Sequence, residues 1–315
     1  EEEEGEEGWP QADSDAARVT LPSVQAGTKA DQGPGDSVPY IVGIDKAMRD
    51  EFGAKMHKIC PTRYWRRRYD IFHKYDAGVC LTNDMFFSVT FEGLGLCVAN
   101  HIVDSLKASN IPPPYTVVDV FAGAGGNTIA LARHPLIKRV ISIELNPSVA
   151  ECNRRNCMIY GVKDKVEIVL DDAFSYLAAR GKERVELEEE LERERQEASE
   201  DCGDEPEDCG MCDAMILSPP WGGPSYMDYD KFPVDLLMEN RMAELSELAG
   251  RVCPRLCMLL PKNSCEHALE RLVQKTRDGA RDQGLGSAYA LLELDDRERM
   301  LALYTGSLAS SIGFL

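Results

Sequence analysis

The chain has 315 residues, of which 43% are hydrophobic and 28% are charged, enough for one large domain with additional polar sequence. Its formal net charge is −19, and two segments carry almost all of it: −8 in residues 1–36 and −10 in residues 181–212. The remainder is close to neutral, so the overall acidity does not exclude a nucleic-acid partner, which would need local Lys and Arg.

The eleven cysteines are scattered, mostly within apolar segments, and the chain carries no signal-peptide pattern and no long apolar run. This predicts a reduced, intracellular protein with no membrane partner. Cys202, Cys209 and Cys212 form a local cluster with one C-x-x-C, but three thiols without a fourth ligand favour free thiols over zinc. No metal is predicted.

The N-terminal part predicts little packed structure. Residues 1–55 begin with EEEEGEEG and contain few large apolar residues, which predicts a disordered acidic arm. Residues 56–110 show two helical patterns, at 63–75 and 91–108, and predict a small helical extension. The basic, aromatic-rich residues 58–75 are either a solvated helix face or a surface for an anionic ligand.

Seven short apolar runs then alternate with helical patterns such as residues 146–161 and 234–250. This alternation predicts an α/β fold, a doubly wound, Rossmann-like sheet covered on both faces, within residues 111–315. The short link before the last run predicts a terminal antiparallel hairpin. The runs are residues 116–121, 139–144, 166–170, 213–218, 255–261, 288–294 and 299–305.

An acidic insert, residues 181–212, separates the third and fourth predicted strands. Its first part is expected to extend the preceding helix through Glu/Arg pairs at i,i+4. We assign it no function.

The segment VVDVFAGAGGNT places Asp119 at the end of the first strand, followed by Gly123, Gly125 and Gly126 before a helix. Such glycines allow close approach of a ligand to the backbone, and the helix start adds unpaired N–H groups. The spacing differs from the G-x-G-x-x-G of dinucleotide folds, and Asp119 suits the cationic amino-acid part of S-adenosylmethionine. Glu144 and Asp172 end the next two strands, suited to ribose and adenine, although each alone could be a cap or loop acid.

The segment SPPWGGPSY follows the fourth strand, at the edge that also holds the glycine loop. Consecutive prolines end the strand ladder, so Ser218, Pro219 and Pro220 present carbonyls and a hydroxyl while Trp221 presents an aromatic face. An exocyclic amine of a nucleobase needs acceptors for its N–H groups and a ring on which the base stacks. The motif therefore predicts N-methylation of a planar amino group.

Together with FFSVT and RYWRRRYDIFHKYDAG, these segments resemble the trimethylguanosine synthase family over residues 62–305, apart from the insert. The resemblance implies a class I methyltransferase that methylates the exocyclic N2 of a 7-methylguanosine RNA cap with S-adenosylmethionine. It implies cofactor contacts at Phe87, Asp119, Phe121, Gly123, Gly125, Asn127, Thr128, Glu144 and Asp172. It places Ser218, Pro219 and Pro220 beside the amine, Trp221 against the base, and Ser88, Lys262 and Asn263 on the cap side.

The chain departs from this family at four positions. Lys262 stands where the family commonly has Arg, which replaces a bidentate phosphate contact by a point charge. Phe91 replaces a proline, and Glu144 and Asn146 replace aspartates. These differences bear on affinity more than on chemistry.

The resemblance further implies small nuclear and nucleolar capped RNAs as substrates and a nuclear location. We expect a monomer, with the acidic arm and insert contacting basic proteins. Two alternatives stay open: an amino-methyltransferase acting on adenine N6 or an internal guanine N2, and a non-catalytic cap-binding module.

Overall fold

The computed structural model describes residues 40–41, 65–82, 84–197, 211–280, 290–295 and 300–310. Of the predicted acidic arm, only Tyr40 and Ile41 fall within this part, where they form β1 (Tyr40–Ile41) and pair with β2 (Cys80–Leu81). The rest of the arm, and residues 198–210 of the insert, lie outside the described residues.

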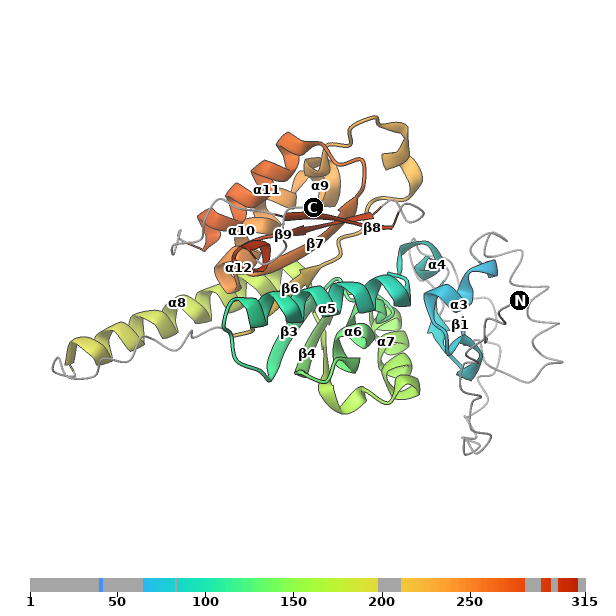
Figure 1. Ribbon diagram of the computed structural model, residues 1–315, viewed down its shortest axis with the longest axis horizontal. Coiled ribbons are helices and arrows are strands. Elements are labelled where there is room, and N and C mark those ends of the chain that lie inside the picture. Colours follow the sequence, from blue (N-terminus) through green and yellow to red (C-terminus); the bar gives the residue numbers. More distant parts are fainter. Residues whose placement is uncertain are drawn as a thin grey trace, which may run out of the picture. The chain divides into compact units, whose positions relative to one another are not determined.

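Seven strands form one sheet in the order β5-β4-β3-β6-β7-β9-β8 (Figure 1). Strands β3 to β7 are parallel, and β9 runs antiparallel to both β7 and β8. This confirms the predicted doubly wound sheet with a terminal antiparallel hairpin. The strand order reverses between β3 and β6, and ligands bind at the carboxyl ends of such strands. The strands are β3 (Tyr115–Val120), β4 (Ile137–Glu144), β5 (Val166–Leu170), β6 (Ala214–Leu217), β7 (Leu256–Pro261), β8 (Ala290–Asp295) and β9 (Met300–Tyr304).

Helices cover both faces of the sheet, as the continuous apolar strands require. Along β3, Tyr115 and Val117 pack into one hydrophobic cluster, whereas Val118 and Val120 pack into another. The first cluster lies under α5 (Glu92–Ala108), α6 (Gly126–Arg133), α7 (Pro147–Tyr160) and α12 (Ser307–Ser310). The second lies under α8 (Ala173–Glu197), α10 (Met242–Val252) and α11 (Glu266–Gly279).

The helix predicted over residues 63–75 is interrupted in its described part: residues 65–66 and α3 (Arg68–Ile71) are helical, the chain turns at residue 67, and it ends in the 3-10 helix η1 (Tyr75–Ala77). Phe72 ends α3 in an extended conformation, with φ −143° and ψ 114°. This break lets Phe72 pack near Tyr160 and Tyr75 near Phe86, so burial of two aromatic rings overrides the local helical pattern. The short helix α4 (Met85–Ser88) then leads into α5.

The helix predicted over residues 234–250 is also interrupted. Met238, Glu239 and Asn240 have φ values of +53°, +56° and +66°, so three consecutive non-glycine residues adopt the left-handed region. Residues five apart in a helix point about 140° away from each other, and the break lets both Leu237 and Met242 be buried. The segment divides into η4 (Val234–Leu236), α9 (Leu237–Asn240) and α10, and two other 3-10 turns are η2 (Lys163–Lys165) and η3 (Pro224–Asp228).

The predicted extension of the helix into the acidic insert is confirmed, because α8 continues to Glu197. Arg184 pairs with Glu188 at 2.8 Å, and Lys182 pairs with Glu186 at 3.6 Å, both at the i,i+4 spacing.

Candidate active site

The glycine loop between β3 and α6 has a backbone that most residues could not adopt. Gly123 and Gly125 have φ values of +57° and +95°. A Cβ on Gly125 would lie 2.5 Å from the Asn153 Oδ1, and one on Gly126 would lie 2.6 Å from the Thr90 carbonyl oxygen. Phe121 has φ +66° without being glycine, which marks local strain of the kind found at functional sites.

Asp119 lies at the carboxyl end of β3 and is fully buried. Its Oδ2 accepts a 2.5 Å hydrogen bond from the Thr128 hydroxyl. Within the described part of the chain, its Oδ1 has no hydrogen-bond partner. Burial raises the pKa of Asp119 to about 7, and the nearby Glu144 adds to the effect while hydrogen bonds from Thr128 oppose it.

Thr128, a predicted cofactor contact, has its hydroxyl engaged inside the fold. Its hydroxyl is buried, donates to Asp119 and lies 3.1 Å from the Ser142 hydroxyl, which in turn accepts from the Asn153 amide at 2.8 Å. Thr128 therefore supports Asp119 from inside the fold. The neighbouring Asn127 is also buried, and its Oδ1 has no partner among the described residues.

Glu144 is the last residue of β4, and Asp172 lies directly before α8, as predicted. Glu144 accepts from the Gly123 N–H at 3.0 Å and from the Asn146 N–H at 2.8 Å, which aims its carboxylate at the glycine loop. Asp172 accepts from the Ser175 N–H at 3.0 Å and so caps the start of α8. Asp172 therefore caps α8, which is one of the two roles that the sequence allowed for it. The other oxygen of its carboxylate takes no part in this hydrogen bond.

The residues present fit S-adenosylmethionine. Two buried acceptor oxygens, on Asp119 and Asn127, have no partner in the part of the chain that the structure describes, and they suit a ligand with an ammonium group. A carboxylate oriented at the next strand end suits ribose hydroxyls, and the glycines leave room against the backbone.

The Ser218–Trp221 turn leaves β6 beside this loop. The Ser218 backbone N–H donates to the Val120 carbonyl at 3.2 Å, after which the two prolines end the ladder. The Trp221 indole N–H donates to the Leu259 carbonyl at 3.2 Å, and its ring meets Tyr226 edge to face at 5.2 Å. The indole is therefore fixed at its edge by β7.

A cavity of about 320 Å³ opens beside Trp221, within the range of small-ligand pockets. It is lined by Pro220, Trp221, Gly222, Ser225, Tyr229, Phe232, Leu236, Leu237, Met238 and Glu239. The lining residues beyond Gly222 were missed by the sequence interpretation, although the aromatic run SYMDYDKF directly follows the proline motif. A larger cavity, about 460 Å³, lies among α8, α10 and α11 and contains none of the predicted site residues.

Asn263, predicted on the phosphate side of the cap, holds two backbone carbonyls with its side-chain amide. Its side-chain amide donates to the Tyr226 carbonyl at 2.9 Å and to the Tyr229 carbonyl at 2.8 Å. These two bonds occupy the donors that a phosphate would need, because an amide nitrogen has two N–H groups. Asn263 shapes the aromatic pocket, while Lys262 directly follows β7 at the same end of the sheet.

Phe87 and Ser88 lie on α4, next to the glycine loop. Phe87 is 48% exposed, and the Ser88 hydroxyl donates to the Asp84 carbonyl at 3.0 Å. A Cβ on Gly123 would lie 3.4 Å from the Met85 sulfur, so α4 contacts the loop directly.

Among the described residues, no group of three His, Cys, Asp or Glu side chains could hold a metal ion. Cys212 is buried beside Cys253, whereas Cys202 and Cys209 lie outside the described residues. No helix in the described ranges is long and apolar enough to cross a membrane.

The strand order, the glycine loop after the first parallel strand and the acid after the second define a class I S-adenosylmethionine-dependent methyltransferase. The family model described as RNA cap guanine-N2 methyltransferase matches residues 115–282, and the chain belongs to this family. It is therefore an S-adenosylmethionine-dependent guanosine N2 methyltransferase acting on RNA caps.

Two curated relatives and two solved structures illustrate the similarity. Trimethylguanosine synthase of Schizosaccharomyces pombe is 28% identical over 213 residues, 65% of this chain and 75% of the relative. That of Saccharomyces cerevisiae is 26% identical over 215 residues, 68% of this chain and 58% of the relative. The methyltransferase domain of bacterial CtHen1 has a TM-score of 0.40 at 12% identity, covering 67% of this chain and 99% of that one. An S-adenosylmethionine-dependent methyltransferase from Agrobacterium tumefaciens has a TM-score of 0.43 at 10% identity, covering 67% and 62%.

Proposed function

We propose that the substrate is a 7-methylguanosine cap and that the products are 2,7-dimethyl- or 2,2,7-trimethylguanosine caps. The observation that carries this proposal is the cavity beside Trp221, lined by residues that follow β6 at the reversal point of the strand order. The name trimethylguanosine synthase of both relatives supports the same substrate. A 7-methylguanine ring is cationic, and an indole attracts a cation placed over its face.

In the proposed cofactor site, Asp119 and Asn127 accept from the ammonium group of S-adenosylmethionine, and Glu144 accepts from the ribose. Asp172 lies on the adenine side, while Gly123, Gly125 and Phe121 form the wall of the site. Phe87 covers it from α4. When bound, S-adenosylmethionine supplies a methyl group on a sulfonium that an amine lone pair can attack.

Positioning dominates the proposed mechanism. Trp221 fixes the plane of the base, and the carbonyls of the Ser218–Pro220 turn accept from the N2 amine so that its lone pair points at the methyl carbon. With S-adenosylmethionine bound, the new N–C bond would form as the S–C bond breaks and S-adenosylhomocysteine leaves, and the amine would lose one proton to water, directly or relayed through the Ser218 hydroxyl. Lys262 and Ser88 contact the cap outside the base.

The test is mass spectrometry of cap analogues incubated with the chain and S-adenosylmethionine. A gain of one or two methyl masses on the 7-methylguanosine cap, without gain on an unmethylated guanosine cap, is expected. Equal methylation of both caps, or methylation of adenosine or internal guanosine instead, would move the substrate to another nucleobase amine. Absence of cofactor binding by calorimetry would favour a non-catalytic cap-binding module.

The finer assignments follow from the same substrate. We propose that the capped RNAs are small nuclear and nucleolar RNAs, that the protein works in the nucleus as a monomer, and that its acidic segments contact basic proteins. Recovery of cross-linked RNA from cells tests the class of RNA, and light scattering of the purified chain tests the monomeric state.

A further inference from the structure

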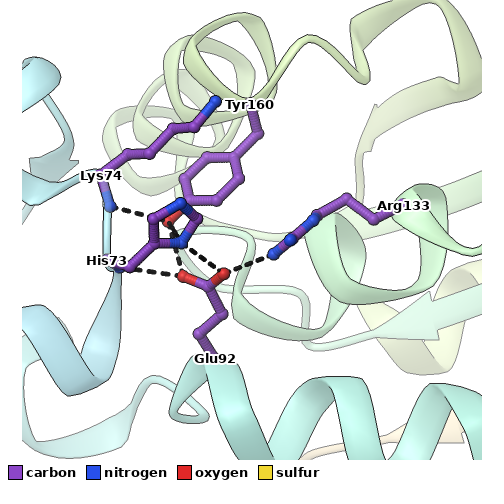
Figure 2. A network of polar contacts seen from close by, with 5 residues as sticks. All are labelled: His73, Lys74, Glu92, Arg133 and Tyr160. Atoms are coloured by element: carbon purple, nitrogen blue, oxygen red, sulfur yellow. Dashed lines mark hydrogen bonds and ion pairs between the residues drawn. The ribbon is translucent and has the colours of Figure 1, made fainter. Parts of the chain in front are cut away.

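Five residues from four separate parts of the chain meet around the Glu92 carboxylate (Figure 2). Glu92 accepts from the His73 backbone N–H at 2.9 Å and from the Tyr160 hydroxyl at 2.7 Å. Its other oxygen lies 2.6 Å from the His73 Nδ1 and also pairs with Arg133. The Lys74 backbone N–H donates to the Tyr160 hydroxyl at 3.3 Å. We call these five residues the Glu92 cluster.

The Glu92 side chain is only 11% exposed, so its interactions are partly shielded from water. Burial acts to raise the pKa of Glu92, but hydrogen bonds from the His73 backbone, Tyr160 and the His73 ring outweigh it and hold the pKa below its ordinary value. The carboxylate therefore stays ionised at neutral pH. A neutral amide at this position would keep the shape but lose the charge and one acceptor oxygen.

Glu92 is the first residue of α5 and directly follows the segment that lies on the cofactor loop. In that segment, Thr90 approaches Gly126 so closely that a Cβ there would lie 2.6 Å from the Thr90 carbonyl oxygen. Val89 and Met85 approach Gly126 and Gly123 in the same way, at 2.9 and 3.4 Å from the corresponding Cβ positions. The position of residues 85–90 thus decides the shape of the glycine loop.

Two other members of the Glu92 cluster lie at the C-terminal ends of α6 and α7. Arg133 is the last residue of α6, which begins at Gly126, and Tyr160 is the last residue of α7. One turn before Tyr160, the Asn156 amide donates at 2.9 Å to the carbonyls of both Ala124, in the loop, and Cys80, in β2. The Glu92 cluster and the glycine loop are therefore connected through the last turn of α7.

We propose that Glu92 is a positioning residue for methyl transfer, which fixes residues 85–90 against the cofactor loop without touching the cofactor. The inference rests on the proposed cofactor site. The four contacts of one carboxylate tie the extension to α6 and α7, so losing its charge loosens the segment that covers the cofactor. The consequence is weaker cofactor binding with a smaller effect on the methyl-transfer step.

The experiment compares Glu92→Gln with Glu167→Gln, which removes a carboxylate from an exposed ion pair with Arg139 on the strands β4 and β5. Calorimetry with S-adenosylhomocysteine, without RNA, measures cofactor affinity, and hydrogen exchange measures the protection of residues 85–91. For Glu92→Gln we expect the Kd for S-adenosylhomocysteine to rise about 10-fold, because a charge-assisted hydrogen bond is lost. We also expect faster hydrogen exchange in residues 85–91. Glu167→Gln should match the wild type in both.

A purely structural role would give a different result. If Glu92→Gln binds S-adenosylhomocysteine as tightly as Glu167→Gln, or if its exchange rises evenly over the whole domain, the proposal is wrong. If Glu92→Gln does not fold, Tyr160→Phe replaces it in the same measurements. This variant removes a single hydrogen-bond donor to Glu92, and its Kd for S-adenosylhomocysteine should be about 3-fold higher. Because these measurements use no RNA, a chain that binds cofactor but does not methylate caps would refute the proposed substrate and leave this test intact.

Discussion

The buried carboxyl of Asp119 should make the stability of the cofactor-free protein depend on pH, and Asp119→Asn should remove that dependence. In the folded chain the pKa of Asp119 is about 7, against 3.8 for an ordinary Asp. The folded state therefore holds its proton more tightly than the unfolded state. Stability from this proton is complete below about pH 4 and is lost as the pH rises to about 7.

The size of the effect follows from the pKa difference. Each pKa unit corresponds to about 1.4 kcal/mol, so the complete change is about 4 kcal/mol. Between pH 5 and pH 8 about 3 kcal/mol of it should be lost. For a domain of this size, that loss corresponds to a fall in Tm of roughly 6–12 °C.

The assay is thermal unfolding of the wild type and Asp119→Asn at pH 5, 6, 7 and 8, with Asp164→Asn, an exposed aspartate of η2, as control. All other titrating groups are shared, so the difference between variants isolates Asp119. The gap in Tm between Asp119→Asn and the wild type should widen with pH, and saturating S-adenosylhomocysteine should narrow it by stabilising the ionised carboxylate. Parallel Tm profiles for the two proteins would refute the assignment of this titration to Asp119.

Three further predictions concern the base pocket and the loop. Trp221→Ala should lower kcat/KM for the 7-methylguanosine cap by roughly 10- to 100-fold while Trp221→Phe retains most of it, measured by mass spectrometry; equal rates for both would remove the stacking role. Gly126→Ala should weaken S-adenosylhomocysteine binding and cost about 1–3 kcal/mol of stability, since its Cβ meets the Thr90 carbonyl, and unchanged calorimetry and melting would contradict this. Asn263→Ala should raise the Kd of a cap analogue, measured by fluorescence quenching, more than that of S-adenosylhomocysteine; the opposite order would show that Asn263 acts on the cofactor side.

The sheet could be predicted from the sequence because each parallel strand is a continuous apolar run. All seven predicted runs overlap an observed strand, with ends that differ by at most two residues. The glycine loop and the proline turn were predictable for a related reason, since Gly125 and the two prolines impose backbone conformations that few other residues allow.

The interrupted helices could not be predicted, because tertiary packing decides them. Met238 and Glu239 are ordinary helix formers, yet both adopt positive φ so that Leu237 and Met242 can both enter the core. The pairs formed by Glu92 likewise span 19, 41 and 68 positions in the sequence, and nothing in the local pattern connects them. The role of Asn263 is of this kind, since its partners Tyr226 and Tyr229 precede it by more than thirty positions.

Several of the places where the chain departs from local rules lie at the carboxyl ends of β3 and β6 and at the pocket beside them. A half-satisfied buried carboxyl at Asp119, a left-handed Phe121 and the left-handed turn at Met238 each cost free energy. The two hydrophobic clusters on the faces of the sheet consist of regular strands and helices, and the burial of their side chains offsets these costs. Sites that break local preference in an otherwise consistent fold are expected to be functional. It follows that a substitution such as Asp119→Asn, which should stabilise the empty protein at neutral pH, should also weaken its hold on a cationic cofactor.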